Sequence, residues 1–250
     1  MRKIITIIFY VTFLFIGKIP AQKTEKHSTD DITSFCTFAK IVDRDGYVNV
    51  RENTNSKSKI IGTIKSGEVV YIFEDLNTEW LDIQYKNENK DKSQYIHRSR
   101  LKYINTFEMI PATIYDDKEA TFILRDIRVD IKVKKFNYEL NKKYFTEIKH
   151  KDGFILRKYK GKEMWGTDGT IPQNYYQSII VTIGNKKIEI PQRDIEDLFN
   201  ATNENAECYY DNTDNSLYLH LANSDGSGSY VVLFKFVNGI YMGRQTEIPF

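Results

Sequence analysis

Aromatic and basic side chains recur through the first half of the chain, and their types suit ligand binding rather than bond-breaking chemistry. The candidate ligand-binding residues are Tyr47, Arg51, Trp80, Tyr95, Arg98 and Arg100. His97 lies between two of them in the sequence and adds an imidazole group. Aromatic rings offer a large flat contact area at small entropic cost, and guanidinium groups bind carboxylates through paired hydrogen bonds. Such a set suits the recognition of peptides or acidic glycans.

The same residues have a purely structural interpretation. Trp80 and Tyr47 have the size and apolar surface of residues that fill a hydrophobic core. Arg98 and Arg100 are typical of solvated charges that keep the edge of a sheet from pairing with another chain. The sequence leaves both interpretations open.

Residues for nucleophilic or acid-base catalysis are not grouped anywhere in the sequence. The four histidines, His27, His97, His150 and His220, are far apart and none adjoins a nucleophile motif. The stretch SDGSGS lacks the G-x-S-x-G spacing and is interpreted as a turn. Glu196 and Asp197 have no facing carboxylate for glycan hydrolysis. We therefore predict no catalytic residues and no enzymatic activity.

Metal-binding patterns are likewise missing from the sequence. It contains no HExxH, no CxxC and no pair of histidines at helical spacing. The stretch DNTDN at 211–215 gathers oxygen ligands but lacks the glycine and the final glutamate of a calcium-binding loop. Since Asn and Asp favour turns for backbone reasons, we predict a solvated turn there, no metal site and no cofactor.

The charge balance excludes one class of partner. Thirty-six basic and thirty-four acidic residues leave a net charge of +2 at pH 7. A nearly neutral chain has no strong field to attract a polyanion over its whole surface. We therefore expect no nucleic-acid partner.

The candidate binding residues lie in a segment with a strand-like pattern, from about 36 to 105. Its runs of β-branched and aromatic residues are separated by polar turns, which predicts five short strands in a small β-barrel. A domain of this size is stable only if its few large residues pack well, and Trp80 is the largest of them. We expect Trp80 to be central to the packing of this barrel.

This segment also resembles a known family. The stretch DGYVNVRENTNSKSKIIGTIKSGEVVYIFEDLNTEWLDIQY, followed by YIHRSRL, is similar to the bacterial SH3 domain (SH3b) family in the kind and order of its motifs. Two positions depart from the family pattern: Glu52 replaces the usual proline after the opening arginine, and Gln94 replaces a glycine. The resemblance implies a small barrel that attaches to cell-wall or envelope material, such as peptidoglycan.

Residues 106–250 predict a second, larger and mostly antiparallel β domain. IRVDIKVK alternates apolar and polar residues as a half-buried strand does, and VTIGNKKIEI and the Asn238-Gly239 pair predict hairpins. The spacing of Ile195, Leu198 and Phe199 after Pro191 predicts one short helix. Leu217, Leu219 and Leu221 predict a strand whose other face exposes Tyr218 and His220. The end of the chain weakly resembles uncharacterised exported bacterial proteins.

The first residues predict export. Arg2 and Lys3 precede a short apolar run that ends at Lys18, which is the layout of a cleavable signal peptide over residues 1–22. A polar, flexible spacer is expected over 23–35. Cys36 and Cys208 then either form one disulfide in an oxidising compartment or remain two separate thiols. We expect no membrane span after removal of the leader, and a periplasmic or extracellular location.

These observations favour an exported, non-enzymatic binding protein of a Gram-negative-type bacterium. The barrel is expected to contact peptidoglycan or another envelope component, and the second domain to bind a protein partner. The alternative is an immunity or inhibitor protein whose C-terminal domain neutralises a secreted bacterial toxin. The sequence does not decide between these two functions.

Overall fold

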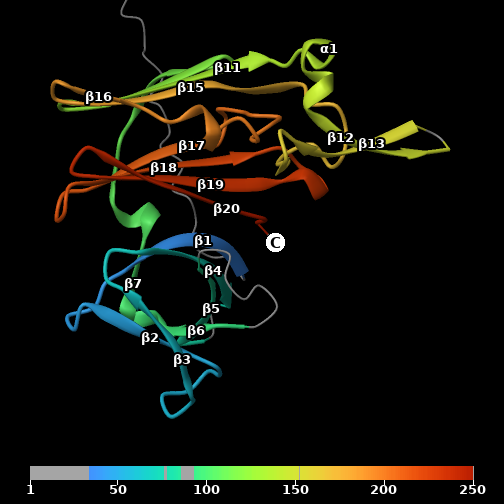
Figure 1. The fold of residues 1–250 in the computed structure, drawn as a ribbon. Coiled ribbons are helices and arrows are strands. Elements are labelled where there is room, and N and C mark those ends of the chain that lie inside the picture. Colours follow the sequence, from blue (N-terminus) through green and yellow to red (C-terminus); the bar gives the residue numbers. More distant parts are fainter. Residues whose placement is uncertain (1–33, 76–77, 86–92, 152, 250) are drawn as a thin grey trace, which may run out of the picture. The chain divides into compact units, whose positions relative to one another are not determined.

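The computed structural model describes residues 34–249 apart from 76–77, 86–92 and 152. Strands dominate these residues, and neighbouring strands in each sheet run antiparallel. This confirms the predicted mainly β fold with an N-terminal barrel-type sheet and larger β sheets after it (Figure 1). The predicted signal peptide over 1–22 and most of the spacer over 23–35 lie outside the described residues.

The N-terminal sheet has seven strands in the order β3-β2-β6-β5-β4-β1-β7. The strands are β1 (Ser34–Ile41), β2 (Tyr47–Arg51), β3 (Ile60–Lys65), β4 (Val69–Asp75), β5 (Trp80–Gln84), β6 (Tyr95–His97) and β7 (Leu101–Tyr103). Five strands were predicted. The structure adds β1, and a 3-10 turn at Arg98–Arg100 divides the predicted last strand into β6 and β7.

The barrel has an aliphatic core, and Trp80 is not part of it. The core consists of Ala39, Ile41, Val48, Val50, Ile64, Val70, Ile72, Leu81, Ile83 and Ile96. In β5 the burial alternates, so that Leu81 and Ile83 face inward while Trp80 is only half-buried. The prediction that Trp80 is central to the packing is therefore wrong, because the period of the strand turns its ring to the opposite face.

Residues after the barrel form a sandwich of two five-stranded sheets. The outer sheet, in the order β16-β15-β11-β10-β9, comprises β9 (Ala112–Tyr115), β10 (Glu119–Leu124), β11 (Ile127–Lys135), β15 (Asn174–Ile183) and β16 (Lys186–Glu189). The inner sheet, in the order β20-β19-β18-β17-β8, comprises β8 (Glu108–Met109), β17 (Ala206–Asp211), β18 (Ser216–Asn223), β19 (Tyr230–Val237) and β20 (Ile240–Glu247).

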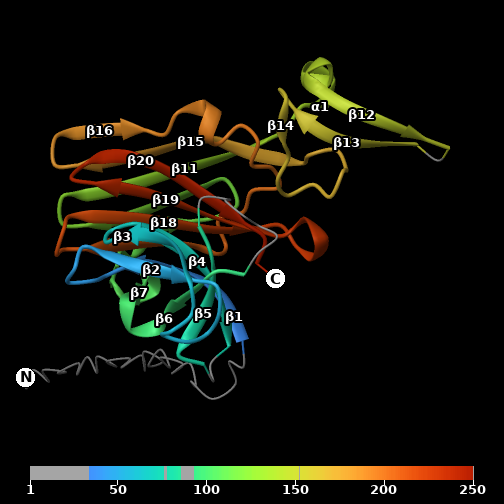
Figure 2. The same cartoon turned by 60° about the horizontal axis from the view of Figure 1, so that its bottom comes forward.

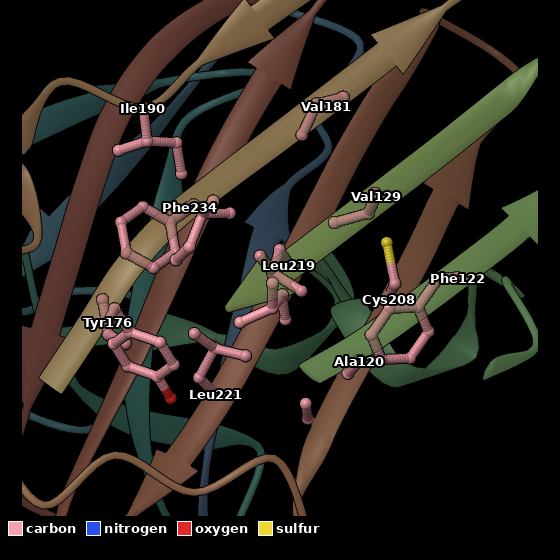
Figure 3. Close-up of a cluster of buried hydrophobic side chains, with 14 of the residues drawn as sticks. Ala120, Phe122, Val129, Tyr176, Val181, Ile190, Cys208, Leu219, Leu221 and Phe234 are labelled. Carbon is pink, nitrogen blue, oxygen red and sulfur yellow. The ribbon is translucent and has the colours of Figure 1, made fainter. Parts of the chain in front are cut away.

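Side chains from both sheets meet in the main core. Val129 and Val181 of the outer sheet face Cys208, Leu219 and Phe234 of the inner sheet (Figure 3). Strand β11 alternates as predicted, and the hairpins close at Gly184-Asn185 and Asn238-Gly239. Among the described residues, Cys208 is a free thiol in this core, and burial raises its pKa above the usual value. Cys208 is thus unpaired in this structure, and the side chain of Cys36 lies outside the described residues.

The helix predicted after Pro191 is wrong. Only Gln192–Asp194 form a 3-10 turn, and the short α-helix is α1 (Tyr138–Asn141) instead. Leu198 and Phe199 are fully buried as their spacing suggests, but they lie in isolated β-bridges. The backbone of Trp165 exchanges hydrogen bonds with Asp197 and Phe199, which holds this segment extended.

The second face of the inner sheet packs against the barrel. Phe38 and Tyr71 of the barrel share a buried cluster with Tyr209, Tyr218 and Leu233 of the sheet, joined by Ile104, Phe107 and Val231. The rings of Phe107 and Tyr218 stack at 5.7 Å, and Phe38 meets His220 edge-on at 5.8 Å. The predicted exposed face of Tyr218 and His220 is therefore wrong, because the barrel covers it.

A buried ion pair reinforces this junction. The Nζ atom of Lys40 in β1 lies 2.7 Å from Asp211 Oδ2 and 2.5 Å from Asp214 Oδ2. Lys40 and Asp211 are almost completely shielded from solvent. The turn predicted at DNTDN is present after Asp211, the last residue of β17, but its predicted solvation is wrong for Asp211, because this buried carboxylate and that of Asp214 bind a lysine of the barrel.

A third, small sheet comprises β12 (Phe145–His150), β13 (Gly153–Tyr159) and β14 (Lys162–Glu163). The β12–β13 hairpin and α1 project beyond the ends of the sandwich sheets, as Figures 1 and 2 both show. Residues 138–160 are called the arm below.

Candidate ligand-binding groove on the barrel

The alternation of strands β2, β5 and β6 sorts the candidate residues onto the outer face of the barrel. Val48, Val50, Leu81, Ile83 and Ile96 point into the core. The residues adjacent to them in each strand, which include Arg51, Trp80 and His97, therefore point outward, as the two-residue period of a strand requires. The opening Y-V-N-V-R motif thus supplies core and surface residues in turn.

The strand order brings these outward residues together although they are distant in sequence. Strand β6 lies between β2 and β5. Its Tyr95 pairs with Arg51 on one side and Asp82 on the other, while His97 pairs with Trp80. Directly opposed side chains in antiparallel strands are close enough to touch.

Trp80 is the centre of this outer face. The guanidinium carbon of Arg51 lies 5.9 Å from the centre of its ring system, which is a cation-π distance. The imidazole of His97 meets the indole edge-on at 5.2 Å. Arg51 also donates a hydrogen bond of 2.6 Å to the carbonyl oxygen of Ser58, which ties it to the loop before β3.

The hydrogen bonds of His97 fix the orientation of its ring. Its Nδ1 atom lies 2.8 Å from Ser99 Oγ and accepts from the backbone N–H of Ser99 at 3.3 Å. Nε2 lies 3.6 Å from a carboxylate oxygen of Glu79. The contacts of Nδ1 with Ser99 hold the His97 ring against one edge of the Trp80 ring.

A second ion pair lies at the other end of the same face. Arg100 Nη1 donates to Asp43 Oδ2 at 2.9 Å, and the Asp43 side chain is almost entirely buried while half of Arg100 is exposed. Asp43 also accepts from the backbone N–H of Asp45. The guanidinium of Arg100 is therefore held in place and already partly neutralised.

Together these side chains line a shallow groove of about 300 Å³. Its lining comprises Asp43, Asp45, Tyr47, Val48, Asn49, Arg51, Ser56, Trp80, His97, Ser99 and Arg100. The groove combines two aromatic surfaces with two guanidinium groups, two carboxylates and several amide and hydroxyl groups. Such a mixture can stack a sugar ring or an apolar side chain and hydrogen-bond a peptide.

Four of the six predicted binding residues line this groove, namely Tyr47, Arg51, Trp80 and Arg100. Tyr95 instead lines a neighbouring hollow with Val50, Gln94 and Tyr85. Arg98 lines neither. Asp43, Asn49 and Ser99 were missed, although Asn49 lies between Tyr47 and Arg51 at the outward period of the same strand.

The described residues contain no group of three or more His, Cys, Asp or Glu side chains that could hold a metal ion. Within the same residues, no helix has the length and apolar character needed to span a bilayer.

Comparison with known proteins identifies the barrel. Residues 46–102 match the family model of the bacterial SH3 domain, and they include strands β2 to β6 and nearly all of the groove lining. No curated protein and no solved structure matches the chain. The barrel is thus a bacterial SH3 domain, as its motifs predicted.

Proposed function

We propose that the protein is an exported, non-enzymatic binding protein that attaches to peptidoglycan through the groove on its bacterial SH3 domain. Domains of this family are typically cell-wall binding modules in bacterial proteins. The observation that carries the proposal is the outward Trp80, flanked by Arg51 and His97 on the uncovered face of the domain.

The chemistry of peptidoglycan matches that of the groove. Its sugar rings present apolar faces that stack on indole and phenol rings, and its stem peptides carry carboxylates that guanidinium groups bind. Arg51 donates one hydrogen bond to the carbonyl oxygen of Ser58, and its other N–H groups can bind a ligand. Arg100 is already paired with Asp43, so we assign the principal carboxylate contact to Arg51.

The test is a pull-down with purified peptidoglycan. It uses the chain from Lys23 onward, because Thr33–Phe250 form one compact unit and the barrel shares a buried cluster with the sandwich. A buried aromatic anchor in an interface contributes roughly 2 kcal/mol or more, so Trp80→Ala should weaken binding about thirtyfold. Arg51→Ala should weaken it about tenfold.

Two tyrosines of equal exposure provide a matched control. Tyr47 in the groove and Tyr115 in the sandwich are each 46% exposed. Tyr47→Ala should reduce the bound fraction, while Tyr115→Ala should leave it unchanged. Equal binding by the unaltered chain and by Trp80→Ala, or no retention of the unaltered chain at all, would refute the proposal.

A further inference from the structure

The arm differs from the rest of the molecule in charge. Residues 138–160 contain seven Lys or Arg and three Asp or Glu, a net charge of +4 in a chain whose total is +2. Lys142, Lys143 and Lys149 are exposed and, within the described residues, form no ion pair. The arm is therefore a local cationic surface on a molecule that is otherwise slightly acidic.

Exposed apolar side chains lie among these lysines. Of the seventeen large hydrophobic residues exposed in the described part of the chain, five lie in the arm. They are Leu140 at 75%, Tyr144 at 42%, Ile148 at 45%, Phe154 at 42% and Ile155 at 40%. Five exposed apolar residues within one short segment indicate an interaction site rather than ordinary surface.

Both faces of the hairpin tip carry apolar groups. Ile148 opposes Ile155 on one face, and on the other Lys149 opposes Phe154, which stacks on Tyr138. Because strand side chains alternate, no single face of the tip is polar throughout. Both faces of the described part of the tip are therefore suited to contact.

The base of the arm is held firmly. Phe145 and Tyr159 lie 4.8 Å apart and both contact Phe199 of the sandwich core. Lys160 and Lys162 pair with Glu196 at 2.7 and 2.9 Å. The tip is therefore presented on a rigid support, away from the sandwich sheets (Figures 1 and 2).

We propose that the arm docks on the surface of an anionic lipid bilayer. Lysines close to a membrane surface are attracted by acidic head groups, and aromatic and aliphatic side chains at the same depth enter the head-group boundary. A projecting convex tip needs no shaped cavity in a bilayer, whereas a folded protein partner would need one. A soluble polyanion would use the lysines but gain nothing from Leu140 or Ile148.

This inference is independent of wall binding, since the arm and the groove share no residue. A protein with both surfaces would hold wall material and a membrane at once. The arm can therefore be tested without reference to peptidoglycan.

The experiment is co-sedimentation of the chain from Lys23 onward with vesicles. Vesicles of phosphatidylcholine alone should retain little protein, and adding one part in three of phosphatidylglycerol should raise the association about tenfold or more. Raising the salt from about 0.1 M to about 1 M should remove most of this gain, because the Debye length falls from about 10 Å to about 3 Å.

Two double variants separate charge from apolar contact. Lys149→Glu with Lys151→Glu should weaken association with the anionic vesicles at least about tenfold. Leu140→Ser with Ile148→Ser should weaken it severalfold, since both side chains are exposed and their loss leaves the fold intact.

Matched controls come from the opposite end of the sandwich. Lys186→Glu with Lys187→Glu makes the same charge change on the exposed β15–β16 hairpin, and Ile240→Ser with Met242→Ser removes equally exposed apolar groups. Both controls should bind like the unaltered chain.

Three outcomes would overturn the inference. The first is equal loss in the arm variants and their controls. The second is equal retention on neutral and anionic vesicles. The third is tight binding of soluble polyphosphate without any effect of Leu140→Ser and Ile148→Ser, which would assign the arm to a free polyanion.

Discussion

Strands β18 and β5 share the same alternation of apolar and aromatic residues, but the aromatic face of β18 is covered and that of β5 is partly exposed. In β18 the leucines face the sandwich core, and Tyr218 and His220 turn to the other side, where the barrel covers them. In β5 Leu81 and Ile83 face the barrel core, and Trp80 turns to the other side, where no second sheet of the described residues packs over it and Arg51 and His97 flank its partly exposed ring.

The difference teaches that alternation assigns a side chain to a face but does not say what covers that face. An aromatic residue on a covered face contributes to stability through its burial. The same residue on an uncovered face has that surface available for a ligand. Stability and binding should therefore respond oppositely to substitutions at the two places.

The largest expected effect is on stability at the covered face. Phe38 is buried against Tyr71 and His220, so Phe38→Ala should lower the free energy of unfolding by about 3 to 5 kcal/mol. Trp80→Ala removes a larger ring that is partly exposed and lies outside the barrel core, and it should cost less. Urea unfolding of both variants compares them, and a greater loss in Trp80→Ala would contradict the difference between the faces.

The second-largest loss of unfolding free energy is expected when the buried ion pair at the same junction is broken. Lys40→Ala leaves the shielded carboxylate of Asp211 without its cation, which costs about 3 kcal/mol because removing one partner of a buried pair is strongly destabilising. Arg100→Ala also leaves a shielded carboxylate, that of Asp43, but water can replace the half-exposed guanidinium, so this variant should lose less, about 1 to 2 kcal/mol. Similar losses in the two variants would show that the junction is not shielded.

The pH dependence of the unfolding free energy tests the same junction, with a smaller expected effect. Burial alone would raise the pKa of Asp211, but hydrogen bonds from Lys40 and Thr213 hold that pKa below its usual value. A depressed pKa contributes stability above the unfolded-state value of about 3.9, and this stability is lost as the pH falls through the folded-state pKa.

The unfolding free energy of the unaltered chain should therefore fall more steeply below about pH 4 than that of Asp211→Asn. The exposed Asp117→Asn serves as the control and should follow the unaltered chain. Parallel acid profiles for Asp211→Asn and the unaltered chain would contradict the assignment.

The smallest expected loss of stability comes from replacing turn glycines, and it should be equal in the barrel and in the sandwich. Gly67 in the barrel and Gly239 in the inner sheet have φ angles of +89° and +66°, and a Cβ atom at either meets no backbone. Alanine at a positive φ costs about 1 kcal/mol wherever it occurs. Gly67→Ala and Gly239→Ala should therefore destabilise equally, and a much larger loss at Gly67 would mean that the barrel is the less tolerant region.

Much of the fold could be predicted because it depends on local signals. The alternation in 127–133 and the residue types of the two hairpin turns dictate strands and connections over a few residues. The outward position of Trp80 was also available from the sequence, since the apolar Leu81 and Ile83 define the inner face of the same strand. The size of the indole ring favours a core position, but the alternation of the strand decides the face on which it lies.

The rest depends on contacts between distant segments. The covering of Tyr218 by the barrel, and the extended form of Leu198 and Phe199, follow from partners far away in the chain. The groove combines β2, β5 and β6, whose order and register bring Trp80 to His97 and Arg51. No local pattern specifies that register, so the sequence did not indicate that Asp43 and Ser99 would join the groove or that Tyr95 would line the neighbouring hollow.

The most direct test uses the two tryptophans as separate reporters. Trp80 lies in the groove and Trp165 packs near Tyr230 in the sandwich, so their indole N–H groups give two NMR signals. On titration with a soluble disaccharide-peptide fragment of peptidoglycan, the Trp80 signal should shift with saturation while the Trp165 signal stays in place. A shift of Trp165 alone, or of neither signal, would contradict binding at the uncovered face of the barrel.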